Sequence, residues 1–185
     1  MKVSLIMPTI NVTKELDLFL QSLVQQTYQD FELIVVDQNP DRRVLDIVMK
    51  YEDKIEIKYI RSSQKGLSLN RNKGLIAREG EIIGFPDDDC EYQPDTIEKV
   101  VSFFEKKKAY RIYSCRTLER GKDYGTGIME TTDMDIKPNN VSKTVKSITF
   151  FVNYRQDEIV LFDENLGVGS VFGSGEETDY VLTLL

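Results

Sequence analysis

The 185-residue sequence contains no histidine. This absence excludes catalytic triads that depend on an imidazole, and it excludes most zinc sites. Acid–base chemistry must therefore come from carboxylates, lysine, tyrosine or cysteine. Cysteine is also scarce: Cys90 and Cys115 are the only two, and they form no spacing motif. We expect two reduced thiols, as is usual in a cytoplasmic protein.

Long apolar runs and an excess of basic residues are missing as well. No apolar stretch approaches the ~20 residues of a membrane span. Residues 1–8 are too short and too soon interrupted by proline to be a signal peptide, so we expect the protein in the cytoplasm. The formal charge of −7 argues against nucleic acid as the main partner, since that calls for a basic face. A phosphorylated ligand is still allowed if carboxylates hold a divalent metal.

The first 110 residues alternate strand patterns and helix patterns with short connections. Strands are predicted at residues 3–7, 31–36, 55–60 and 81–85, and helices at residues 16–24, 41–51, 66–78 and from Pro94 onward. Four such units predict an α/β fold with a mainly parallel sheet and helices on both faces. Ligands of these sheets bind beyond the C-terminal ends of the strands. The first candidates for a site are therefore Thr9, Asp37 and residues 87–89.

The pattern changes after Tyr110. A further strand is expected at residues 111–116, and residues 119–143 read as a long loop. Residues 147–154 and 158–162 resemble two strands that pair antiparallel. A glycine-rich segment then leads into a last helix, which keeps its apolar spacing up to Leu185 without a cap. We expect residues 1–185 to form a single domain and the natural protein to continue beyond it.

Three adjacent carboxylates, Asp87 to Asp89, follow the predicted strand at residues 81–85. Neighbouring carboxylates raise one another's pKa values unless a cation or hydrogen-bond donors offset the charge. Mg²⁺ and Mn²⁺ bind one or two carboxylates together with phosphate oxygens of a substrate. The run therefore indicates a metal-dependent phosphate site, and the alternative is a solvated acidic turn.

Two other segments place polar residues at predicted helices. Residues 66–74 begin with glycine and carry Arg71, which suits a phosphate or the edge of a base; the alternative is a solvated helix face. Glu176 and Glu177 follow the glycine-rich segment, where one of them would take a proton from a substrate hydroxyl. The alternative there is helix capping, because acidic residues favour the first turn.

In this order, the features resemble the family 2 inverting glycosyltransferases of GT-A fold. The resemblance covers almost the whole chain and rests on residues 3–11, 22–28, 31–37, 66–74, 87–89 and 173–179. It implies a Rossmann-like nucleotide-sugar fold with a small C-terminal antiparallel region. It also implies a donor half at residues 1–110 and an acceptor half at residues 111–185, which would be incomplete here. By analogy, the setting is bacterial surface-polysaccharide assembly.

The resemblance also implies roles in donor binding. Pro8, Thr9 and Ile10 would line the nucleobase pocket. Asp37 would bond the base or the ribose. Arg71 would face the base or the diphosphate.

A second set of roles concerns the metal and the proton. Asp88 would lie near the ribose, and Asp89 would bind the metal that bridges the diphosphate. Asp87 would complete the D-x-D pattern as a further metal ligand. Glu177 matches the position of the general base, with Glu176 beside it.

Two departures from the family pattern leave questions open. The second strand usually continues with another aspartate, but here Gln38 follows Asp37, so the base is not fixed. The family base is most often aspartate, whereas this chain has two glutamates, so Glu176 and Glu177 both remain candidates.

The function implied is metal-assisted transfer of a sugar, with inversion, from a nucleotide-diphosphate sugar. A UDP-sugar is favoured as donor, Mn²⁺ or Mg²⁺ as cofactor, and a saccharide or lipid-linked molecule as acceptor. A lipid-linked acceptor would bring peripheral contact with the inner face of the membrane through a segment outside this chain. One alternative is a nucleotide-sugar-binding domain without activity. The other is a sugar nucleotidyltransferase, which usually needs a glycine-rich loop where residues 9–13 have no glycine.

Overall fold

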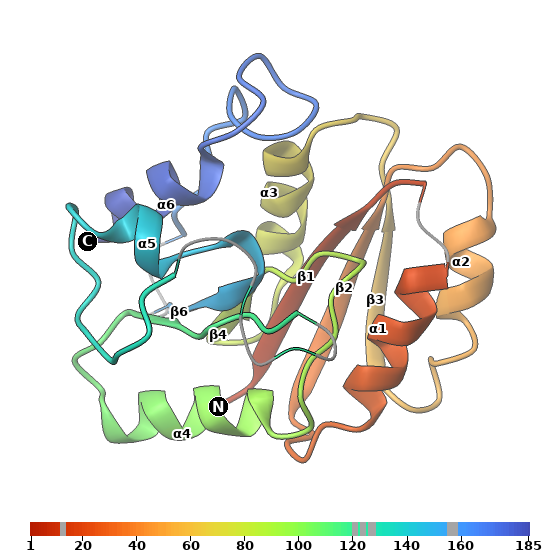
Figure 1. The fold of residues 1–185 in the computed structure, drawn as a ribbon. Helices are drawn as coiled ribbons and strands as arrows, with labels where there is room; N and C mark the ends of the chain where they lie inside the picture. The colour runs from red at the N-terminus through yellow and green to blue at the C-terminus, as the bar shows by residue number, and fades with distance from the viewer. Residues whose placement is uncertain (12–13, 120–121, 123–124, 126–128, 155–158) are drawn as a thin grey trace.

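A six-stranded sheet forms the centre of the protein in this computed structural model, which describes residues 1–11, 14–119, 122, 125, 129–154 and 159–185 (Figure 1). The strands are β1 (Val3–Thr9), β2 (Phe31–Asp37), β3 (Glu56–Arg61), β4 (Ile82–Gly84), β5 (Ile112–Ser114) and β6 (Phe150–Asn153), in the order β3-β2-β1-β4-β6-β5. β3, β2, β1 and β4 are parallel, and β6 is antiparallel to both β4 and β5. The predicted α/β fold with a mainly parallel sheet is confirmed.

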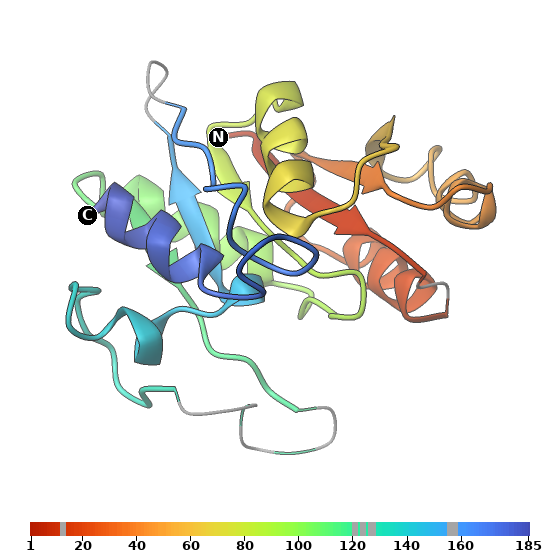
Figure 2. The same ribbon diagram turned by 90° about the horizontal axis from the view of Figure 1, so that it is seen from above.

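Helices cover both faces of this sheet, as predicted. One face carries α1 (Lys14–Val24), α2 (Arg43–Val48) and α4 (Thr96–Lys106), and the other carries α3 (Leu67–Ala77), α5 (Val141–Thr144) and α6 (Glu176–Leu184). Figure 2 shows α1 and α3 on opposite sides of β1. Along β1, the side chains of Leu5 and Met7 pack in the apolar core on the face of α1, α2 and α4. The side chain of Ile6 packs in the core on the face of α3, α5 and α6, as the alternation of a strand requires.

Helix α3 lies unusually close to β1. A Cβ atom added to Gly74 would stand 2.3 Å from Cγ2 of Ile6, so only glycine allows this approach. The close approach buries the polar side chains of α3, namely those of Ser68, Asn70, Arg71 and Asn72. A solvated helix face at Arg71, one of the two interpretations of this segment, is therefore wrong.

The antiparallel region differs in detail from the prediction. Residues 159–162 form no strand, and residue 158 lies outside the described residues, so the expected pairing of 147–154 with 158–162 is wrong. β6 pairs with β4 and β5 instead. Asn72 explains the difference, because its side chain accepts a hydrogen bond from the amide of Phe162 at 2.8 Å and donates one to its carbonyl at 3.0 Å. These bonds occupy backbone groups that a strand would have used.

Two smaller points complete the fold. The expected loop at residues 119–143 also contains the start of α5. Within the described residues, no helix combines the length and the apolar composition that crossing a bilayer requires.

Candidate active site

The C-terminal ends of β1, β2 and β4 meet at one edge of the sheet. Thr9 and Asp37 end neighbouring strands and are paired in register. The Thr9 hydroxyl donates to Oδ2 of Asp88 at 2.5 Å. Burial raises the pKa of Asp88, and the bonds from Thr9 and from the backbone amide of Ile10 oppose the rise. The end of β1 and the aspartate run are thus fixed to each other.

Asp37 is fully buried and already holds three hydrogen bonds. Its Oδ1 accepts from the amide and the side-chain nitrogen of Asn39, at 2.8 and 2.7 Å. Its Oδ2 accepts from the Tyr59 hydroxyl at 2.5 Å. Burial, with the bond to Asp37 second, raises the pKa of Tyr59 to about 12. Asn39 also accepts from the amide of Asn11 at 2.9 Å, which ties the loop after β1 to the end of β2.

The start of α3 is anchored from two sides. Gln38, the residue that departs from the family pattern, accepts a hydrogen bond from the amide of Gly66 at 3.0 Å. Ser68 donates to the carbonyl of Leu166 at 2.6 Å, and the amide of Leu67 donates to the carbonyl of Val168 at 3.0 Å. The glycine-rich segment near the C-terminus therefore lies against the start of α3.

Arg71 is a fully buried cation between the aspartate run and α6. Its Nη2 lies 3.5 Å from Oδ1 of Asp87, and its Nη1 lies 3.8 Å from Oε1 of Glu176. Nη2 also donates to the hydroxyl of Ser147, and the guanidinium lies 5.3 Å from the ring centre of Phe162. Burial lowers the pKa of Arg71, and the carboxylates around it oppose the change, with Asp87 first. One side chain of α3 thus links the segment that follows β4 to the start of α6.

The surroundings of the aspartate run disfavour the ionised form of Asp87. The pKa of Asp87 is raised to about 6, first by burial; Arg71 opposes the rise, whereas Asp89, Asp88 and Glu177 add to it. Asp89 is exposed at the edge of the site. The run therefore combines a half-buried carboxyl with an accessible one.

The two glutamates of α6 occupy different environments. Glu176 is buried, and its pKa is raised chiefly by burial. Gly167 packs against it, since a Cβ there would stand 3.2 Å from its Cδ. Glu177 is only partly buried. The glycine before them, Gly175, has φ 100°, a backbone conformation that favours glycine. Of the two, Glu176 thus forms an ion pair with Arg71, and Glu177 is the more accessible.

A family model described as glycosyl transferase family 2 matches residues 4–151. The chain belongs to this family. An uncharacterized glycosyltransferase of Haemophilus influenzae is 26% identical, over 98% of this chain and 61% of its own length. The poly(ribitol-phosphate) beta-N-acetylglucosaminyltransferase TarS of Staphylococcus aureus is 33% identical, over 57% of this chain and 19% of its own. The chain thus spans less than two thirds of these relatives.

The fold agrees with the family. The crystal structure of S. aureus TarS 1–349 in complex with UDP-GlcNAc superposes with a TM-score of 0.79, at 25% identity, over 98% of this chain and 52% of that one. The family 2 chain therefore has the GT-A fold, as the resemblance implied.

In this GT-A chain, the predicted site residues form two connected groups. Thr9 and Asp88 form one group, with the backbone of Ile10, and Arg71 joins Asp87 to Glu176 in the other. Pro8 is buried in β1 beside them.

Several supporting residues were not predicted, namely Asn39, Tyr59, Ser147 and Phe162. Asn39 lies in the segment after β2 that departs from the family pattern. An unexpected polar residue at this place was the only sign of its role that the sequence offered. The others lie on segments whose place beside the site depends on tertiary packing.

A different acidic group lies at the opposite, N-terminal ends of the strands. Glu32, Glu56 and Glu79 form a group of three carboxylates whose oxygens lie within 4.8 Å of one another. Two ammonium groups lie among them: Lys2 is 2.7 Å from Glu56, and Lys58 is 3.3 Å from the buried Glu32. Because lysines already neutralise this group, we interpret it as a structural ion-pair network.

Proposed function

We propose that this chain transfers a sugar from a nucleotide-diphosphate sugar, preferably a UDP-sugar, to a hydroxyl of a saccharide or lipid-linked acceptor. The observation that carries the proposal is the buried Arg71, which joins Asp87 of the donor half to Glu176 at the start of α6. A site of this kind can hold the diphosphate and the attacking hydroxyl next to each other. The TarS complex with UDP-GlcNAc supports the choice of donor.

The nucleotide would bind over the ends of β1 and β2. Pro8, Thr9 and Ile10 would line the base pocket, with Asp88 near the ribose. A carboxylate offers about four acceptor positions, and Asp37 uses three of them within the protein. Since Asp37 is fully buried, an N–H group of the base would reach it only if a neighbouring side chain, such as Asn39 or Tyr59, moved aside.

The aspartate run fits a divalent cation. The pKa of Asp87 is raised first by burial and then by the neighbouring carboxylates, which a cation would offset, and Asp89 is exposed beside it. Mn²⁺ and Mg²⁺ suit such carboxylates together with phosphate oxygens. Asp89 would hold the cation with Asp87 as a second ligand, and a cation there supplies positive charge for the departing diphosphate.

Proton abstraction falls to Glu177. Glu176 is buried against Arg71, whereas Glu177 is partly accessible at the start of the helix. Glu177 would take the proton of the acceptor hydroxyl as its oxygen attacks the anomeric carbon. Attack from the face opposite the diphosphate is a single displacement, so the configuration of that carbon inverts.

A thermal-shift series with UDP, GDP, CDP and ADP, each with and without Mn²⁺, tests donor binding. We expect UDP with Mn²⁺ to raise the unfolding temperature most, and Asp89→Ala to remove the part that depends on metal. Equal stabilisation without metal would contradict the role of Asp89.

Turnover is tested by release of UDP from UDP-GlcNAc. Glu177→Gln should keep the shift in unfolding temperature that UDP causes, and it should lower the turnover rate roughly 10²–10⁴-fold. A wild-type rate in this variant would show that another group is the base.

The setting we propose is polysaccharide assembly at the cytoplasmic, inner face of a bacterial membrane. It rests on analogy with relatives such as TarS. Fractionation of cells that express the full-length protein tests it: recovery with the cytoplasm or the inner membrane is expected, and recovery in the periplasm or the medium would contradict it.

A further inference from the structure

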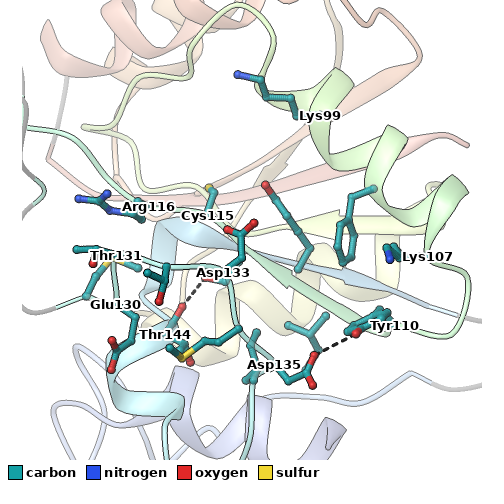
Figure 3. Close-up of a pocket in the computed structure, with 18 of the residues that line it drawn as sticks. Lys99, Lys107, Tyr110, Cys115, Arg116, Glu130, Thr131, Asp133, Asp135 and Thr144 are labelled. Atoms are coloured by element: carbon teal, nitrogen blue, oxygen red, sulfur yellow. Dashed lines mark hydrogen bonds between the residues drawn. The ribbon is translucent and has the colours of Figure 1, made fainter.

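A large hollow lies along β5, which is the outer strand on the opposite side of the sheet from β3. It has a volume of about 1210 Å³ and is lined by α4, by β5 and by residues 129–136 (Figure 3). Pockets that hold one small ligand measure about 300–1,000 Å³. This hollow, the β5 groove, therefore has room for a chain of several rings.

One end of the β5 groove lies at the active-site edge of the sheet. β5 is antiparallel to β6, and β6 is antiparallel to β4, so Cys115 and Arg116 follow β5 at the edge where Asp87 follows β4. Tyr92 lies between the two places. Burial raises its pKa well above the usual range, and the thiols of Cys90 and Cys115 and the carboxylate of Asp87 add to the rise. The groove thus reaches the same edge of the sheet as the aspartate run, with β6 between β5 and β4.

Aromatic rings form one wall of the β5 groove. The ring centre of Phe103 lies 4.6 Å from that of Tyr113 and 5.6 Å from that of Tyr110. Tyr110 is 43% exposed, and its hydroxyl donates to Oδ1 of Asp135 at 3.0 Å (Figure 3). Such rings combine a flat apolar face with a polar tip. A sugar ring, with C–H groups on its faces and hydroxyls on its rim, fits this combination.

The charges of the β5 groove are balanced. Five basic and five acidic side chains line it, and Figure 3 shows both signs on each side of the view, Arg116 and Glu130 on one and Lys107 and Asp135 on the other. Carboxylates accept hydrogen bonds and ammonium groups donate them, so the lining serves a ligand rich in hydroxyls. A polyanion would require an excess of basic residues.

We infer that the β5 groove binds an uncharged oligosaccharide, the part of the acceptor that precedes the reacting hydroxyl. That this oligosaccharide belongs to the acceptor rests on the proposed function, whereas the binding of an oligosaccharide in the groove does not. The topology supports separate places for donor and acceptor. The residues proposed to bind the donor follow β1, β2 and β4, and the groove lies along β5, the last strand on that side of the sheet.

Calorimetric titration with cellohexaose, maltohexaose and chitohexaose, and with a sulfated heparin hexasaccharide as the anionic probe, tests the inference. We expect at least one neutral hexasaccharide to bind more tightly than heparin. Tyr110→Ala should weaken that binding roughly fivefold, the loss of one aromatic contact. Met49→Ala removes a side chain of similar exposure, 47%, next to α2 and outside the groove, and should leave binding unchanged.

The outcomes separate this inference from the proposed function. Failure of all three neutral probes to bind, tighter binding of heparin, or equal binding by Tyr110→Ala and wild type would each overturn the groove assignment. The UDP shift of Tyr110→Ala should match that of wild type, which shows that the variant is folded. Absence of a UDP shift in the wild type would overturn the proposed function instead, and the titration would still decide the groove.

Discussion

Arg71→Met tests whether a single buried cation holds the two halves of the site together. Methionine keeps an unbranched, flexible side chain, although a shorter one, and removes the charge. In the wild type the guanidinium lies 3.5 Å from Asp87 and 3.8 Å from Glu176, and its own exposure is zero. The substitution therefore leaves two carboxylates close together without their shared cation.

The size of the effect follows from the burial of each partner. Removing one member of a buried ion pair costs about 3–5 kcal/mol. Water reaches Asp87, whose side chain is 40% exposed, but hardly reaches that of Glu176 at 5%. We therefore expect Arg71→Met to lower the free energy of unfolding by roughly 2–4 kcal/mol, or the unfolding temperature by roughly 5–15 °C for a chain of this size.

Urea denaturation of four proteins measures this: wild type, Arg71→Met, Glu176→Gln and the double variant. The double variant should lose less than the sum of the single variants, by roughly 0.5–3 kcal/mol, because it leaves one buried carboxylate fewer without a partner. Arg42→Met is the matched control; its side chain is 64% exposed in a surface pair with Asp46, so it should change stability by less than about 0.5 kcal/mol. Arg71→Met within that same margin, or strictly additive losses, would refute the reasoning.

Three further substitutions test the supports of the site by urea denaturation. Gly74→Ala should destabilise by about 1–3 kcal/mol despite the better helix propensity of alanine, because its Cβ would overlap β1; a gain in stability would contradict the close approach. Asn72→Ala should cost about 1–3 kcal/mol, since the buried amide and carbonyl of Phe162 lose their partners; no loss would show that they find others. Lys58→Met should cost about 1–3 kcal/mol because Glu32, which is fully buried, loses its nearest cation; wild-type stability would show that Lys2 suffices.

The sequence was most informative where a single pattern of apolar residues corresponds to a single structural environment, as in the buried parallel strands. The parallel strands are short apolar runs, and the strand ends carry Thr9, Asp37 and the aspartate run, so the edge that bears the site was predictable. It was less informative in the C-terminal third. Residues 158–162 have the composition of a strand, but Asn72 bonds the backbone of Phe162, and no local pattern reports a contact between residues 90 positions apart.

The roles of the two glutamates show the same limit. From the sequence, Glu177 matched the position of the base, and Glu176 beside it remained a second candidate. The structure distinguishes them by neighbours from other segments, since Arg71 comes from α3 and Gly167 from the glycine-rich loop. The burial of Glu176 therefore depends on packing against segments that are distant from it in the sequence.

Helix α3 explains why the site forms at this edge. An amphipathic pattern predicts which side of a helix faces the core only if the core is apolar. Here the buried side is polar, because Gly74 lets the helix approach β1, and because Asp87 after β4 and Glu176 on α6 lie beside the guanidinium of Arg71. Burial of that cation is tolerated only while both carboxylates remain near it. Correct packing of α6 and binding competence at the aspartate run are therefore coupled through α3. A variant that loosens α6 without touching the aspartates, such as Gly167→Ala beside Glu176, should weaken UDP binding as well as stability, and an unchanged UDP affinity would show that the two halves act independently.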